Sequence, residues 1–533
     1  MFGFILKKLQ YQKIKSQNAN KDDDNKTKKE GHANYTEVLS ENVSNIKSAL
    51  GNSNDLVIRQ FSFGHKQCIN AAIVFIDGMT NTIIINQDII EPLIYGTKTE
   101  SLKLPLDNSK IVGMLSVSDV QNANTLEKII EGFLSGDAVL MIDGMNEALI
   151  ISCKGWEKRS ISEPATESVI RGPREGFTEN LRTNTAMLRR KIKNPELTME
   201  MFNLGKKTNT NITIAYIRGI ANQELIEEVR CRINGINTDS ILESGYIEQF
   251  IEDAPVSIFS TMGYTEKPDV VAARLIEGRI AILIDGTPFV LTVPMFFIES
   301  FQTAEDYYSR PYFMSMLRII RFISFIITIL APAVYVAITT YHQELIPTKL
   351  LFTMAAAREG VPLPAAFEAG LMIVVFEILR EAGVRLPRPV GQAISIVGAL
   401  VMGESAVSAG LIGEPMVIVI AITAVALFVV PNQADAAAIL RLIYLVLSAV
   451  MGGMGITVGL LATLIHLAAL KSFGYYYISP IAPFQLSDTK DSLIRAPLWS
   501  MRTRPSGLAR NDKVRQASSV QNSKKSDERN NKH

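Results

Sequence analysis

Residues 322–340 read FISFIITILAPAVYVAITT, nineteen residues without a charge. A helix of about 20 apolar residues is long enough to cross the hydrocarbon core of a bilayer. The stretch therefore predicts a transmembrane span near residues 319–340. Pro332 lies inside it and predicts a kink, because neighbouring membrane helices can satisfy the carbonyl that a proline leaves without its donor. The chain is expected to be an integral membrane protein.

Further apolar stretches follow, and they predict spans near 389–413, 415–434 and 439–470. Within the last of these, residues 442–470 would measure about 43 Å as one straight helix, which is longer than an untilted crossing. Glycines at residues 452–455 lie near its middle. They indicate a hinge in one tilted helix, a boundary between two shorter elements, or a tight helix crossing.

A shorter apolar core, AGLMIVVF at 369–376, lies between the first two spans. Charged residues flank it on both sides. It therefore predicts an interfacial or re-entrant helix at 363–381 rather than a full crossing.

Basic residues around the spans predict the topology. Arg310, Arg318 and Arg321 precede the first span, and residues 486–533 hold eleven Lys or Arg against five Asp or Glu. Lys and Arg concentrate in cytoplasmic loops, so both ends of the chain are expected in the cytoplasm, with an even number of crossings. Four crossings are preferred, and a basic stretch at residues 380–388 leaves six open.

The half of the chain before these spans contains a repeated pattern. Three segments share one design: NAAIVFIDGMTNTIIIN (70–86), DAVLMIDGMNEALIIS (137–152) and RIAILIDGTPFVLTVP (279–294). A looser copy is NITIAYIRGIANQEL (211–225). Each holds a β-rich run that ends in Asp-Gly or Arg-Gly. The order of the copies predicts an internal duplication of one strand-and-helix unit.

Three Asp-Gly pairs end these runs: Asp77–Gly78, Asp143–Gly144 and Asp285–Gly286. Glycine supplies the positive φ angles that tight turns require, so we interpret the pairs as structural turns. Catalytic acids or metal ligands are the alternative, which we favour less because turn chemistry already accounts for both residue types.

The predicted fold is an α+β soluble N-terminal half, made of two related mixed α/β subdomains, followed by an all-α polytopic membrane domain. The expected segments are a disordered polar extension (1–56), subdomain 1 (57–153), a basic helical linker (154–204), subdomain 2 (205–300), the membrane domain (311–484) and a basic disordered tail (485–533).

The linker contains the loop IRGPREGF at 170–177, which places Arg171 and Arg174 beside glycines, and Arg182 follows in a predicted helix. These arginines have three interpretations. They pair with nearby glutamates and hold the subdomains, they form a subunit interface, since arginine is favoured at interfaces, or they bind phosphate or lipid headgroups.

Glu404 is the only charge in the predicted 389–413 span, and small residues surround it, among them Ser405 and Ser408. A carboxylate inside a membrane is costly and usually faces a cavity or the interior of a helix bundle. A ring of such carboxylates from several copies would attract cations. Glu368 is a further candidate for such an ion pathway. The alternative for Glu404 is a single buried carboxylate hydrogen-bonded to serine or backbone.

Composition and motifs exclude several function classes. The net charge is +1, which gives no general attraction for nucleic acid. Cys68, Cys153 and Cys231 lie far apart, as in a reducing compartment. The sequence contains no GxxxxGK[ST], HExxH or Gly-x-Ser-x-Gly motif, so no cofactor, metal or enzymatic activity is expected.

Together these segments resemble the A subunits of the GerA family of spore germination proteins, which are components of germinant receptors. The resemblance rests on TESVIRGPREGFTENLRTN (166–184), on the repeated IDG strands and on FEILREAGVRLPRPVGQAISIVGALVMGESAVSAGLI (376–412). It covers roughly residues 57–485.

The resemblance implies a multi-pass protein of the spore inner membrane with its soluble half on the core side. It implies a transporter-like B subunit and a lipoprotein C subunit as partners, contact with membrane lipid, and a homo-oligomeric ring that acts as a ligand-gated cation channel. Two other functions stay open: a signalling scaffold that conducts nothing, and a subunit that transports a solute.

Overall fold

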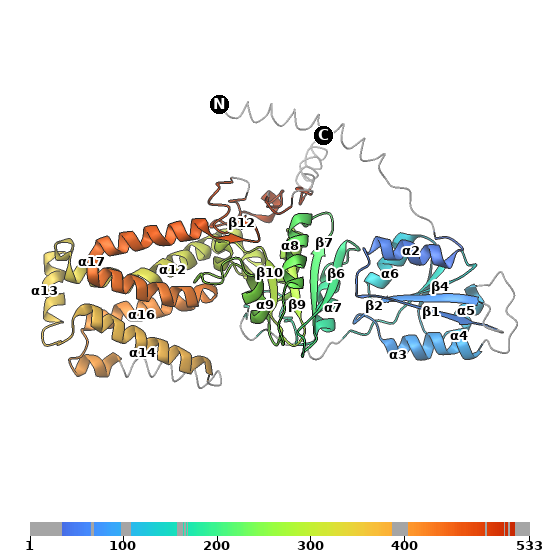
Figure 1. The fold of residues 1–533 in the computed structure, drawn as a ribbon, viewed down its shortest axis with the longest axis horizontal. Coiled ribbons are helices and arrows are strands. Elements are labelled where there is room, and N and C mark those ends of the chain that lie inside the picture. The colour runs from blue at the N-terminus through green and yellow to red at the C-terminus, as the bar shows by residue number, and fades with distance from the viewer. Residues whose placement is uncertain are drawn as a thin grey trace, which may run out of the picture. The chain divides into compact units, whose positions relative to one another are not determined.

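The computed structural model describes residues 35–64, 69–96, 108–156, 164, 167, 169–385, 403–485, 488–505, 507–509 and 512–516. They form two compact units, shown as ribbons in Figure 1. The first unit comprises the residues up to Ile161 together with Phe177–Phe202, and the second comprises Ser162–Gly176 and the residues from Asn203 onward. Each unit is described by itself.

A five-stranded antiparallel sheet forms the centre of the first unit, in the order β1-β2-β4-β5-β3. Its strands are β1 (Leu56–Phe63), β2 (Ile69–Ile76), β3 (Val120–Ala123), β4 (Ala138–Ile142) and β5 (Ala148–Ile151). Its helical elements are α2 (Leu39–Ala49), α3 (Thr82–Ile84), a π-helical turn (Ile85–Ile90), α4 (Glu91–Gly96), α5 (Asn108–Met114), α6 (Leu126–Leu134) and α7 (Leu181–Lys191).

Both faces of this sheet are buried, as β2 shows. Ile73 and Phe75 point into the core on the side of α3, α4 and α5, whereas Val74 and Ile76 point into the core under α2 and α6. Side chains alternate between the two faces along a strand. Because both faces are covered, β2 is a nearly continuous apolar run, and Figure 1 shows the helices on its two sides.

The second unit contains a sheet of the same topology, in the order β6-β7-β9-β10-β8. Its strands are β6 (Leu197–Leu204), β7 (Thr210–Ile217), β8 (Gly263–Thr265), β9 (Ile280–Ile284) and β10 (Val290–Val293), and its helices are α8 (Gln223–Asn234), α9 (Ser244–Ile251) and α10 (Pro268–Ile276). Strand for strand, the order repeats that of the first sheet. The predicted pair of related α/β subdomains is therefore confirmed.

Two predicted segment boundaries are wrong. Residues 39–49 belong to the first unit rather than to a disordered extension, because α2 buries Leu39, Val43 and Ile46 against the sheet. Residues 177–202 also belong to that unit rather than to a linker, because α7 is largely buried there. In both segments polar residues surround the few apolar ones, so the sequence pattern does not indicate that these segments are folded. Residues 1–34 lie outside the described residues.

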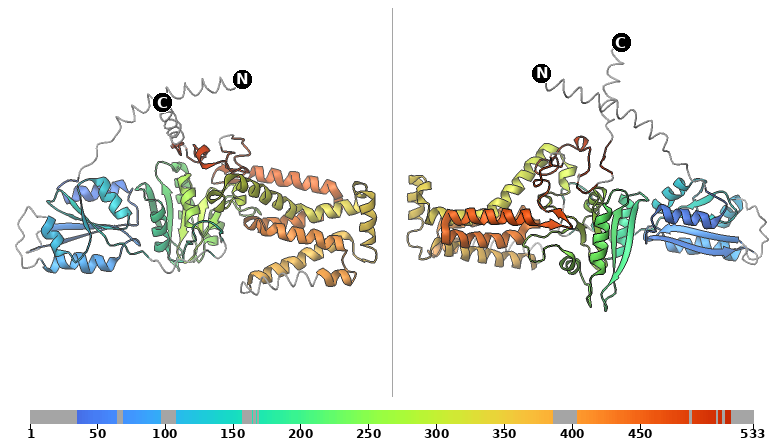
Figure 2. Two further views of the ribbon diagram at one scale, coloured as in Figure 1. Left: turned by 180° about the vertical axis from the view of Figure 1, so that it is seen from behind. Right: turned by 45° about the horizontal axis from the view of Figure 1, so that its top comes forward.

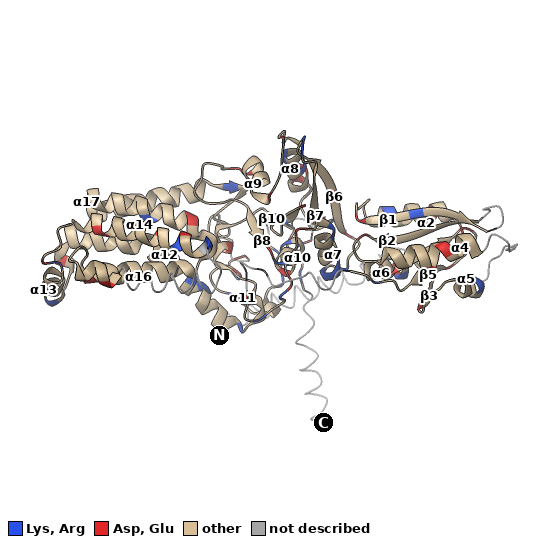
Figure 3. Ribbon diagram, turned by 90° about the horizontal axis from the view of Figure 1, so that it is seen from below, with Lys and Arg blue, Asp and Glu red and all other residues tan. Residues whose placement is uncertain are grey.

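The rest of the second unit is helical. Its elements are a 3₁₀ turn, η3 (Phe297–Phe301), then α11 (Glu305–Tyr308), α12 (Pro311–Thr340), α13 (Thr348–Ala356), α14 (Ala365–Arg385), α16 (Glu414–Phe428) and α17 (Ala434–Ala469). By length and composition, two helices could cross a membrane, Pro311–Thr340 and Pro431–Ala469, and α16 is a shorter apolar helix. Figure 3 shows few charged residues along α12, α16 and α17.

α17 is a helical hairpin rather than one straight helix. Gly452 interrupts it with a φ of +57° and a ψ of −137°. The hydroxyl of Tyr444 lies 2.8 Å from Oγ1 of Thr463, although these residues would lie about 28 Å apart along a straight helix. The two arms therefore run antiparallel, as Figure 2 shows in orange. The single span predicted at 439–470 is wrong, and the alternative of two shorter elements is correct.

The helical part of the second unit, from α12 to α17, is called the helical unit below, and it has two ends. At the junction end it meets the second sheet subdomain, where Gln433 donates to a hydroxyl of η3 and His466 lies 3.0 Å from Ser257. At the opposite, far end the hydroxyl of Tyr341 donates to the carbonyl of Ala449, 2.7 Å away. α12 and both arms of α17 therefore run from one end to the other.

α14 and α16 run between the same ends. α14 begins at the far end, where Glu368 accepts a hydrogen bond from the amide of Gly413, which precedes α16. Its 21 residues measure about 31 Å, so it is longer than the interfacial helix predicted at 363–381. Of the span predicted at 389–413, residues 389–402 lie outside the described residues, and the chain is helical again at 403–408.

The segment after α17 returns to the junction end. A short pair of strands, β11 (Lys471–Ser472) and β12 (Tyr475–Tyr476), begins it. Arg495, Met501 and Leu508 are almost completely buried. The disordered tail predicted from residue 485 is therefore wrong for 488–505 and 507–509, because these residues pack against the second sheet subdomain and α12. Residues 517–533 lie outside the described part of the chain.

Candidate functional site

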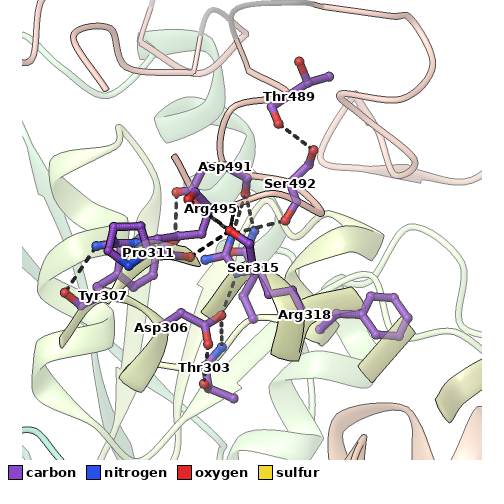
Figure 4. Close-up of polar contacts among 12 residues, drawn as sticks. Thr303, Asp306, Tyr307, Pro311, Ser315, Arg318, Thr489, Asp491, Ser492 and Arg495 are labelled. Atoms are coloured by element: carbon purple, nitrogen blue, oxygen red, sulfur yellow. Dashed lines mark hydrogen bonds and ion pairs between the residues drawn. The ribbon is translucent and has the colours of Figure 1, made fainter. Parts of the chain in front are cut away.

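Arg318 lies in the third turn of α12, and its side chain is completely buried at the junction end. Figure 4 shows it between two carboxylates from distant parts of the sequence. Its Nε lies 2.7 Å from Oδ2 of Asp306, which belongs to α11, and its Nη1 lies 2.8 Å from Oδ1 of Asp491, which follows α17. Nη1 also donates to the carbonyl of Ser492. One guanidinium thus joins three segments.

Neighbouring side chains complete this network. Nη1 of Arg321 lies 2.9 Å from Asp306, and the hydroxyl of Tyr307 donates to Asp491 at 2.8 Å. Burial and the negative charge of Asp491 raise the pKa of Tyr307 well above its ordinary value, so the phenol stays protonated. We call Asp306, Tyr307, Arg318, Arg321 and Asp491 the juxtamembrane cluster.

The cluster is balanced in charge, with two guanidinium groups against two carboxylates. Removing one partner of a buried ion pair typically costs about 3–5 kcal/mol, because the other charge is left buried without compensation. A second contact supports the same joint: Ser315 Oγ accepts a hydrogen bond from the amide of Arg495. The first turns of α12 are therefore held firmly to both α11 and the segment after α17.

The sequence predicts only part of this site. It predicts that Arg318 and Arg321 flank and orient the first span, but it places Asp491 in a disordered tail. Asp306 and Asp491 lie 185 positions apart, so only the fold brings them together. The signal available in the sequence was the position of Arg318 directly before a predicted membrane span.

The opposite side of α11 contacts the loop that contains Arg171. Glu305 accepts hydrogen bonds from the backbone amides of Ile170 and Arg171, and the hydroxyl of Tyr308 donates to Asp269. Gly172 approaches the Tyr308 ring so closely that a Cβ there would lie 2.8 Å from it. α11 thus contacts this loop through Glu305 and contributes Asp306 and Tyr307 to the juxtamembrane cluster.

The structure separates the three candidate arginines of the predicted linker. Arg171 and Arg174 belong to the second unit, with exposed side chains. Arg182 belongs to the first unit, where its Nε lies 3.2 Å from Oδ2 of Asp77. The candidate arginines are thus divided between the two units, each of which is described by itself.

The candidate ion-pathway residues have contrasting surroundings. Glu368 is completely buried: its Oε1 lies 2.9 Å from Nη2 of Arg358, and its Oε2 accepts from the Gly413 amide at 3.1 Å. Glu404, Ser405 and Ser408 lie in the short helical stretch 403–408, and all three are exposed. Glu368 is thus engaged in holding the far end together, whereas Glu404 is accessible.

The Asp-Gly pairs lie at the ends of strands. Gly78, Gly144 and Gly286 have φ values of +79°, +81° and +90°. The pairs at 143–144 and 285–286 lie in the β4–β5 and β9–β10 connections, whereas the pair at 77–78 leads into α3. Asp143 also accepts a hydrogen bond from the Leu39 amide at the start of α2. Within the described residues, no group of three or more His, Cys, Asp or Glu side chains could hold a metal ion.

Comparison with known proteins gives the family. The profile of the Bacillus/Clostridium GerA spore germination protein matches residues 44–507. Spore germination protein KA of Bacillus subtilis (strain 168) is 47% identical over 483 residues, which are 90% of this chain and 88% of that protein. The uncharacterized membrane protein YfkQ of the same organism is 43% identical, covering 89% and 91% of the two chains.

A third relative, spore germination protein GerLA of Bacillus cereus, is 39% identical, over 89% of this chain and 96% of that protein. Among solved structures, the N-terminal domain of the A subunit of the Bacillus megaterium spore germinant receptor GerK3 is 39% identical. It matches with a TM-score of 0.39 over 50% of this chain and 98% of that one. The chain belongs to the GerA family of spore germination proteins.

Proposed function

We propose that this chain is the A subunit of a spore germinant receptor and that copies of it form a ring that opens a cation path when nutrient germinants bind. The family match supports the germination role. The observation that carries the mechanism is the juxtamembrane cluster. Because it fixes α12 to α11 and to the segment after α17, a movement in the soluble half is passed to the first and last helices.

The setting follows from the family resemblance. The partners are a transporter-like B subunit and a lipoprotein C subunit, and the location is the spore inner membrane, with the soluble half on the core side. Arg171 and Arg174 stay candidates for contacts between subunits because their side chains are exposed.

Glu404 is the residue we propose for the ion path. Its exposed carboxylate lies beside the small polar residues Ser405 and Ser408, and a ring of such carboxylates would attract cations by direct charge interaction. Glu368 is left out of this path because Arg358 and the Gly413 amide engage both of its oxygens.

The test is cation release from spores that carry Glu404→Gln, with the germinant applied externally. We expect release to slow several-fold, or the ratio of monovalent to divalent flux to change, because the substitution removes the charge and keeps the shape. Glu344→Gln is the matched control, since Glu344 is also an exposed carboxylate of the helical unit but lies in the turn after α12. It should leave release unchanged.

Unaltered release and selectivity in Glu404→Gln, at normal protein level, would show that this carboxylate does not line the path. The scaffold function predicts instead that the reconstituted complex has no conductance at all. The transporter function predicts uptake of labelled germinant into vesicles by this chain alone.

A further inference from the structure

The second unit contains a cavity of about 760 Å³ outside the helical bundle. Its walls come from α8, from the residues before β9, from η3 and from the segment that follows α17. Pockets for small molecules typically measure 300–1,000 Å³, so this one is large enough for a small organic ligand.

The walls of the cavity carry an excess of negative charge. Three cationic side chains line it, Arg232, Arg279 and Lys471. Seven carboxylates line it as well: Glu224, Glu228, Asp253, Glu277, Glu299, Asp488 and Asp491. The lining side chains sum to a net charge of about −4 with all groups ionised, and Arg318 and Arg515, which pair with Asp491 and Glu277 from outside the lining, reduce it to about −2. The balance still favours a cationic occupant. Burial raises the pKa of Glu277, and the charges of Arg279 and Arg515 oppose this shift.

Glu299 provides the second observation. Its side chain is 7% exposed, and its Oε2 accepts a hydrogen bond from Nη1 of Arg279. Its Oε1 is shielded from solvent and has no hydrogen-bond partner among the described residues, so a ligand in the cavity that Glu299 lines reaches this oxygen when the side chain turns toward it. Leaving a buried acceptor unsatisfied costs about 1–3 kcal/mol, and more for a charged group. A donor supplied by a ligand would remove that cost.

The lining favours an organic cation over a metal ion. No group of three His, Cys, Asp or Glu side chains among the described residues is arranged to hold a metal. The cavity is also far larger than a bare ion needs. Aromatic rings contribute to its walls, including Tyr475, and such rings attract ammonium and guanidinium groups. The protein's own Arg279 and Arg232 already lie over two further lining rings, Phe296 and Phe473.

We propose that this cavity binds a small organic cation whose ammonium or guanidinium group donates a hydrogen bond to Oε1 of Glu299. Tyr307 and Asp491 line the cavity and also belong to the juxtamembrane cluster. A ligand here therefore lies beside the joint that holds α12. The proposal goes beyond the proposed function, because the site lies outside the helical unit and its occupancy does not depend on conduction.

The experiment measures binding to the purified full-length chain in lipid nanodiscs by isothermal titration calorimetry, without any flux assay. Putrescine is the probe because it is a small dication. Its neutral analogue 1,4-butanediol has the same length and tests whether charge is required. Calcium chloride tests the metal alternative. We expect saturable binding of putrescine that weakens with added salt, and no binding of the diol or of calcium at this cavity.

Variants assign the binding to the cavity. Glu299→Gln should weaken putrescine binding at least tenfold. Glu224→Gln combined with Glu228→Gln should weaken it several-fold through lost charge; both residues are exposed on α8, so folding is preserved. Glu227→Gln is the matched control, because Glu227 lies on the same helix but outside the lining. It should bind as the natural chain does.

Four results would overturn the proposal: no binding of putrescine, equal binding of the diol, calcium that displaces putrescine, or folded Glu299→Gln and α8 variants that bind as tightly as the control. If Glu299→Gln fails to fold, the α8 double variant alone decides the question. Because no ion flux is measured, loss of the channel function would leave this result unchanged.

Discussion

Arg189 and Arg318 are both completely buried, and each pairs with a carboxylate from a distant part of the sequence, Asp55 and Asp491 respectively. Nε of Arg189 on α7 lies 2.6 Å from Oδ2 of Asp55, which precedes β1, and Ser53 also donates to Asp55. This pair fixes α7 to the first sheet, as the juxtamembrane cluster fixes α12 in the second unit. The sequence predicts neither pair, since their partners lie more than a hundred positions away or in segments that read as disordered.

The Asp55–Arg189 pair predicts how stability depends on pH. Burial alone would raise the pKa of Asp55, but the charge of Arg189 and hydrogen bonds from Arg189 and Ser53 outweigh it and hold the pKa below its ordinary value. The stabilisation is therefore complete above the unfolded pKa of about 3.9 and is lost as the pH falls through the folded value. Protection factors of the α7 and β1 amides, that is, exchange rates relative to the intrinsic rate at the same pH, should fall below about pH 4.

Asp55→Asn should lower the free energy of unfolding of the first unit by about 3–5 kcal/mol, because Arg189 stays buried without its counter-charge. It should also flatten the pH dependence of hydrogen exchange. Glu131→Gln, at an exposed position on α6, is the control and should change neither. Equal protection in both variants at neutral pH would show that the ion pair contributes little.

α17 shows at the scale of one element what hydropathy can and cannot predict. The apolar run and its glycines were visible in the sequence, and so were α12 and α16. Hydropathy does not report direction, however, so a hairpin and a straight helix of the same composition look alike. The hairpin is specified by Gly452, whose backbone conformation only glycine adopts readily, and by the close approach of Tyr341.

Gly452→Ala is therefore expected to destabilise the helical unit by at least about 1–3 kcal/mol. The new Cβ would lie 2.8 Å from Cγ of Tyr341, in addition to the backbone strain. Thermal unfolding of the detergent-purified chain measures the effect. Gly370→Ala on α14 is the control, because its Cβ would meet nothing closer than 3.8 Å and alanine favours helix there. Equal melting of both variants would argue against the hairpin.

At the scale of the whole molecule, the direction of each helix gives the number of passages. α12 leaves the junction end, α14 returns to it, and α16 again runs from the far end to the junction end. The two arms of α17 then go out and back. Residues 386–402 lie outside the described part of the chain, so the described helices give five passages between the two ends. Both four and six crossings therefore stay predictions, with an even number expected from the basic flanks.

Cysteine labelling with a membrane-impermeant reagent tests this topology. Glu344→Cys, at the far end, should label from the side opposite to Lys490→Cys and to the exposed native Cys231, which serves as the internal reference. Glu381→Cys on α14 decides between the two numbers. With six crossings it should label from the same side as Cys231, and with α14 outside the bilayer it should label with Glu344→Cys.

The return of the chain to its starting place has a mechanical consequence. The first turns of α12 and the segment that leaves α17 are fastened to one another through Arg318 and Asp491, so the beginning and the end of the helical bundle share a single anchor. A helix bundle that is held at one end moves most at the other end. Displacements should therefore be largest at the far end, where α13, the Gly452 turn and the stretch that carries Glu404 are found. A given movement at the junction end would shift a gate most if the gate lay there.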